Sequence, residues 1–172
     1  MTGAASDSLS ALLNGDDGCC GQDPDGGGGC GKCVLVTNPD AVNSDWKVLV
    51  MKKNRCPPWA TGCGSSIPHL DFAAPGYDNL QYSQANICGF SDTYISQTDS
   101  SICGDWYNYG ASTIEGCDCS SMAETTDAQK MLKKGCELFT AWGWKSGDPT
   151  SLTYEIVTCP SAYVSLIGNA FD

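Results

Sequence analysis

The chain has 172 residues, a formal net charge of -11 at pH 7 and 12 cysteines. Nucleic acids and anionic membrane surfaces bind proteins through basic patches, so this acidity excludes both as expected partners. A neutral polysaccharide carries no such charge penalty. The length fits a single domain over residues 1–172, with no separate carbohydrate-binding module.

The cysteines predict an oxidised, extracellular protein. Their number is even and they are spread along the whole chain, as in secreted disulfide-rich domains, so we expect six disulfides among the 12 cysteines. Zinc is the alternative, because Cys30-Gly31-Lys32-Cys33 and Cys117-Asp118-Cys119 have the spacing of ligand pairs. We expect a secreted monomer without a cofactor. Its start lacks a signal peptide and is interpreted as a processed or truncated boundary.

Strand and helix signals predict a mainly β chain with few helices. Branched and apolar runs predict strands at residues 34–36, 46–51, 67–72, 136–142 and 151–159. Short helices are expected at residues 8–13 and 121–132, with Gly135 as the stop after the second. The stretch 75–115 shows no clear period and is predicted to be a loop pinned by Cys88 and Cys103. Short strands joined by cross-linked loops favour a small β-barrel or sandwich.

Asp71 is the first candidate functional residue. It lies in a strand-like run that stops at Ala74-Pro75-Gly76, and pleated strands usually exclude aspartate. A carboxylate on a rigid strand end beside the chain's single histidine, His69, indicates a placed acid. The alternative for Asp71 is a structural carboxylate that caps a turn amide. For His69 the choice is between tuning Asp71 in a groove and packing in the core, and one histidine alone cannot build a metal site.

Four motifs in a fixed order carry a family resemblance. They are Cys30-Gly31-Lys32-Cys33-Val34-Leu35-Val36, Lys53-Asn54-Arg55-Cys56-Pro57, His69-Leu70-Asp71-Phe72, and Leu132-Lys133-Lys134-Gly135-Cys136 through Trp142 to Val157-Thr158-Cys159-Pro160. In this order they resemble the family-45 glycoside hydrolases, over roughly residues 30 to 160. The resemblance implies a six-stranded double-psi β-barrel, shared with expansins. It also implies a secreted endo-β-1,4-glucanase that hydrolyses cellulose or related β-glucans with inversion.

The resemblance assigns the general acid to Asp71, because the family's His-x-Asp strand carries it. An inverting glycosidase also needs a second group that holds a water across the sugar. The family's main branch places that base before paired cysteines, but Asp17-Gly18-Cys19-Cys20 has one residue too many, so the base is not assigned to Asp17. Asn54 is the candidate for the second catalytic position, because an amide can position a water although it is a poor proton acceptor. The alternative for Asn54 is a turn residue before Cys56-Pro57.

Aromatic residues in loops are candidates for stacking on glucose rings. Trp59 and Tyr77 are the expected substrate-binding aromatics, together with His69 in the groove. Further loop aromatics of the same kind are Trp106, Tyr107 and Tyr109. Tryptophans in strand patterns are expected in the core instead: Trp46, Trp142 and Trp144.

The resemblance also implies part of the disulfide pattern. It pairs Cys33 with Cys159, and Cys136 with either Cys117 or Cys119. The rival function is a non-hydrolytic, expansin-like protein that binds glucan or loosens walls, since the family's Asp-Cys-Cys motif is missing. A cysteine-rich structural or inhibitor domain is the third possibility, and it predicts no binding to cello-oligosaccharides.

Overall fold

The computed structural model describes residues 1–13, 32–56, 58–59, 63–64, 66–72, 118–125, 127–143 and 151–162. Its main element is a sheet of five strands: β1 (Thr2–Ala5), β2 (Cys33–Thr37), β3 (Val48–Arg55), β4 (Leu70–Phe72) and β5 (Thr153–Val157). The helices are α1 (Asp7–Leu12), α2 (Asp127–Trp142) and a short 3-10 turn, η4 (Cys119–Ser121). Within these ranges no helix is long and apolar enough to cross a membrane.

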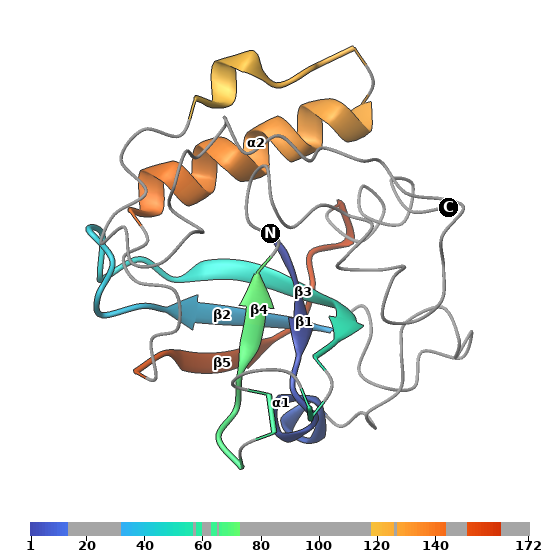
Figure 1. The fold of residues 1–172 in the computed structure, drawn as a ribbon, viewed down its shortest axis with the longest axis vertical. Helices are drawn as coiled ribbons and strands as arrows, with labels where there is room; N and C mark the ends of the chain where they lie inside the picture. Colours follow the sequence, from blue (N-terminus) through green and yellow to red (C-terminus); the bar gives the residue numbers. More distant parts are fainter. Residues whose placement is uncertain are drawn as a thin grey trace.

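The sheet is mixed and open. Its strand order is β4-β1-β3-β2-β5, with β1 parallel to β3 and every other pair antiparallel. In the view of Figure 1, β1 and β4 run nearly upright while β2, β3 and β5 run across. Because β4 and β5 are the two ends of the order, the described strands do not close into the expected six-stranded barrel. The expected content of strands with few helices is confirmed.

The main core lies where the helices meet one face of the sheet. Alternate residues of β2 and β3 supply branched side chains to it, as expected for strands with one covered face. Phe139 and Trp142 of α2 and Leu9 of α1 pack against them, and Figure 1 shows α2 lying along one side of the sheet with α1 at the opposite end of the molecule. The predicted core position of Trp142 is confirmed, and Trp46 is partly buried against the same core; Trp144 lies outside the described residues.

The strand predicted at residues 136–142 is wrong, because these residues form the second half of α2. Cys136, Phe139 and Trp142 are buried, and their spacing of three is that of one helix face rather than of a strand. Gly135 does not stop the helix, which ends instead at Gly143 with φ of 70°. That left-handed conformation is the one in which glycine ends helices.

The sequence patterns predict no strand at β1, which lies between β3 and β4 in the sheet. Its residues, Thr-Gly-Ala-Ala, include no large apolar side chain and so give no strand signal. Small size is what the position requires, since a Cβ on Gly3 would lie 2.6 Å from the backbone oxygen of Asp71. The helix predicted at 8–13 corresponds to α1, and the one at 121–132 to η4 and the start of α2.

Three disulfides lie among the described residues. Cys33–Cys159 ties β2 to the chain after β5, and Cys119–Cys136 ties η4 to α2. Both pairings implied by the family resemblance are confirmed. Zinc ligation by Cys33 or Cys119 is thereby excluded in the oxidised chain. The third bond, Cys56–Cys63, was not predicted; the remaining cysteines lie outside the described ranges: Cys19, Cys20, Cys30, Cys88, Cys103 and Cys117.

Candidate active site

Asp71 occupies the middle of β4, on the strand face opposite the main core. Leu70 belongs to that core and Phe72 packs against it, so the alternation of a strand turns Asp71 the other way. Ala4 is its register partner on β1, and the side chain of Ala4 packs with Cys56 and Cys63 in a separate small cluster. Backbone pairing of β4 with β1 therefore fixes where this carboxyl lies.

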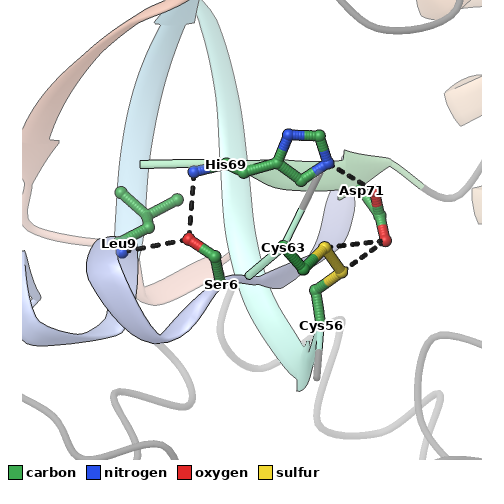
Figure 2. The surroundings of a disulfide bond; sticks show 6 residues. All are labelled: Ser6, Leu9, Cys56, Cys63, His69 and Asp71. Atoms are coloured by element: carbon green, nitrogen blue, oxygen red, sulfur yellow. Dashed lines mark hydrogen bonds and ion pairs between the residues drawn. A yellow bond between two sulfur atoms is a disulfide. The ribbon is translucent and has the colours of Figure 1, made fainter. Parts of the chain in front are cut away.

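The imidazole of His69 lies beside the Asp71 carboxyl. Its Nε2 is 2.8 Å from Asp71 Oδ1, and Figure 2 shows the ring turned toward the carboxyl. His69 directly precedes β4, and its side chain reaches the carboxyl of Asp71 two residues further along the chain. The His69 side chain is 17% exposed and that of Asp71 is 45% exposed, so the carboxyl can be reached from solvent while the ring is mostly covered.

The second carboxyl oxygen faces the Cys56–Cys63 disulfide. Asp71 Oδ2 lies 2.8 Å from Cys56 Sγ and 3.8 Å from Cys63 Sγ (Figure 2). Neither sulfur of a disulfide carries a hydrogen, so neither can donate to this oxygen. These four residues, Asp71, His69, Cys56 and Cys63, are called the acid cluster below.

Ser6 anchors the backbone of His69, directly before β4. Its backbone N–H donates to His69 O at 2.9 Å, and its Oγ accepts from His69 N at 3.0 Å. The same Oγ accepts from Leu9 N at 3.2 Å and so caps the start of α1. Ser6 is fully buried. One side chain thus fixes both the helix entry and the backbone of His69.

The other residues predicted for the site lie in different parts of the chain. Asn54 lies on β3 opposite Ala4, which also pairs with Asp71, so all three positions form one row across the sheet. A register shift between Gly3 and Ala4 precedes this row, and such irregularities often occur next to active sites. Trp59 is 69% exposed on the loop that the Cys56–Cys63 disulfide closes. Tyr77 lies outside the described residues.

The cluster contains a single carboxylate. Among the described residues, the groups of ligand type within 4.8 Å of one another are the two cysteine sulfurs, His69 and Asp71. The capping alternative for Asp71 finds no support there, since its carboxyl contacts an imidazole and a disulfide rather than a turn amide. Sequence reasoning missed the disulfide and Ser6. The cysteine pair had one usable signal, a sequence separation of only 7 beside Pro57 and Pro58.

Comparison with known proteins adds no relative. No protein-family model, no curated protein and no solved structure matches this chain. The features that bear on function are therefore the acid cluster and the sequence motifs.

Proposed function

We propose that the protein is a secreted, inverting endo-β-1,4-glucanase of the family-45 type, with Asp71 as its general acid. The observation that carries the proposal is the environment of that carboxyl, which has an imidazole on one oxygen and a disulfide on the other. A glucosidic oxygen is a poor leaving group, so cleavage requires a protonated carboxylic acid that reaches it. The six-stranded double-psi barrel is part of this proposal, since it extends the open five-stranded sheet.

Both contacts of Asp71 orient its carboxyl. His69 Nε2 lies within hydrogen-bond distance of Oδ1. Oδ2 faces the disulfide sulfurs, which carry no hydrogen and therefore bring no competing donor. A sugar oxygen can reach the carboxyl from solvent, because its side chain is 45% exposed, as a general acid requires.

The row through Ala4 supports a second catalytic position at Asn54. Asn54 and Asp71 are separated by two strand spacings of about 4.8 Å each, or roughly 9.6 Å between backbone positions. Inverting glycosidases leave roughly 6.5–9.5 Å between their two carboxyl groups to hold a water, and backbone positions two strands apart are compatible with such a separation. An asparagine is a poor proton acceptor, so the general base is not assigned.

Trp59 is proposed to bind a sugar ring. Its indole is 69% exposed, and the Cys56–Cys63 disulfide closes the loop that carries it. A large aromatic side chain left in solvent on a covalently closed loop costs little entropy when a flat ligand covers it. Tyr77 is proposed for the same role from the sequence alone.

A non-hydrolytic, expansin-like glucan-binding protein is the second candidate. One observation favours it: among the described residues, the acid cluster contains the carboxylate of Asp71 but no second carboxylate that could act as a general base. A groove with an acid but no base binds glucan without activating water. The extracellular location proposed in both cases is compatible with the three disulfides.

Incubation with cellohexaose separates the two candidates. The glucanase proposal predicts shorter oligosaccharides whose new reducing ends first appear as the α-anomer, which proton NMR detects before mutarotation. The expansin-like alternative predicts no products but saturable binding by calorimetry. If the protein gives no products and shows no binding, both candidates are refuted and a structural or inhibitor domain remains.

A further inference from the structure

The acid cluster contains the donor set of a tetrahedral metal site. Two sulfurs, one imidazole nitrogen and one carboxylate oxygen all lie within 4.8 Å of one another. A zinc ion with bonds of about 2.3 Å to sulfur and 2.0–2.2 Å to nitrogen and oxygen spaces its ligand atoms roughly 3.3–3.8 Å apart. Small side-chain movements bring the four donors to that spacing once the sulfurs are free to separate.

Three of the four donors are held by backbone contacts that do not depend on the disulfide. His69 is anchored by Ser6, and Asp71 by the pairing of β4 with β1. The N–H of Cys56 donates to Ala5 O at 2.9 Å, at the end of β3. Opening the disulfide therefore leaves these three in place and releases the side chain of Cys63.

Reduction of the Cys56–Cys63 disulfide gives two thiols, which can bind a metal ion as thiolates. A disulfide sulfur is not a thiolate and does not bind zinc as one. A phosphine attacks one sulfur and gives up two electrons, and the S–S bond breaks. A water molecule then supplies one proton to each sulfur, and its oxygen becomes part of the phosphine oxide. A dithiol achieves the same reduction and leaves as a cyclic disulfide. Zinc binding then releases the two thiol protons to solvent.

We propose that, once the Cys56–Cys63 disulfide is reduced, the acid cluster binds one Zn²⁺ through its two thiolates, its imidazole and its carboxylate. Soft thiolates combined with an imidazole select zinc over magnesium or calcium. The exposed side of Asp71 gives the ion an entry path. The proposal does not require that the protein be a hydrolase, so either can fail without the other.

The first test uses the full chain reduced with a water-soluble phosphine under argon and titrated with Co²⁺, which reports tetrahedral thiolate ligation by its visible absorption. Reduction also frees the other thiols of the 12 cysteines, so the proposed site is identified by the absorption that depends on His69. One such ion per chain is expected, and Zn²⁺ should displace it. His69→Ala keeps all 12 cysteines and should weaken binding at least about 100-fold, since even residues behind a metal ligand cost 10–100-fold. The paired variant Cys119→Ser/Cys136→Ser also loses two thiols but lies outside the cluster, and it should bind within about threefold of the reduced wild type.

The second test needs no reductant. Cys63→Ser frees the Cys56 thiol and leaves the other disulfides of the oxidised chain closed, so it answers the question even if full reduction unfolds the protein. It should bind one Co²⁺ more weakly than the reduced wild type, because one thiolate is lost, yet still show a thiolate-to-metal charge-transfer band at saturating Co²⁺. Cys63→Ser/His69→Ala should lose that band. Absence of the band in Cys63→Ser, or equal affinity of reduced wild type and reduced His69→Ala, overturns the proposal.

Discussion

Replacing Ser6 by alanine should loosen the backbone of His69, directly before β4, and destabilise the fold. The fully buried Oγ accepts hydrogen bonds from Leu9 N and His69 N. Loss of the helix cap costs about 1 kcal/mol, and the His69 amide left without its acceptor costs about 1 kcal/mol more. The free energy of unfolding should therefore fall by about 2 kcal/mol.

Urea denaturation with all disulfides intact measures this change. With a slope of about 2 kcal/mol per molar, the midpoint of Ser6→Ala should fall by about 1 M while the slope stays constant. Ser44→Ala, at an exposed turn position, is the control and should change stability by less than about 0.5 kcal/mol. A Ser6→Ala midpoint equal to that of the control would refute the anchoring role of Ser6.

Three further substitutions test the packing and the loop. Trp142→Ala removes a fully buried ring whose centroid lies 5.9 Å from that of Phe72 in an edge-on arrangement. The free energy of unfolding measured by chemical denaturation should fall by about 3–5 kcal/mol. Gly143→Ala would place a Cβ 2.4 Å from that of Val42 at φ of +70°, so thermal unfolding should report a loss of about 2 kcal/mol or more. Trp59→Ala should change stability by less than about 0.5 kcal/mol, because the ring is 69% exposed. It should nevertheless raise the KM for cellohexaose about fivefold, from the loss of about 1 kcal/mol of aromatic contact; an unchanged KM would remove Trp59 from the site.

Local patterns were enough to locate most strands and both residues at the centre of the site. The branched runs of β2, β3 and β5 lie where the sequence predicts strands, because such residues favour a pleated, half-buried surface. His69 and Asp71 are two residues apart in the predicted strand 67–72 and could be considered together from the sequence. The structure places His69 directly before β4, with its Nε2 2.8 Å from Asp71 Oδ1.

Features fixed by long-range packing could not be read in the same way. Residues 136–142 combine β-favouring and apolar side chains with a helical spacing of three, and the burial of Phe139 and Trp142 against the sheet favours the helix. β1 consists of small residues whose strand state depends on fitting between β3 and β4. The approach of the Cys56–Cys63 disulfide to Asp71 likewise joins the end of β3 to β4, a contact that no local pattern encodes.

The most direct test of the central claim is the activity of Asp71→Asn. The variant keeps the size of the side chain but cannot donate a carboxylic proton, so release of reducing sugars from soluble cellulose should fall at least about 100-fold. Asp45→Asn, at an exposed turn position, should retain wild-type activity, and both variants should show wild-type circular dichroism. Asp71→Asn activity within about threefold of the wild type would contradict the assignment of Asp71 as the general acid.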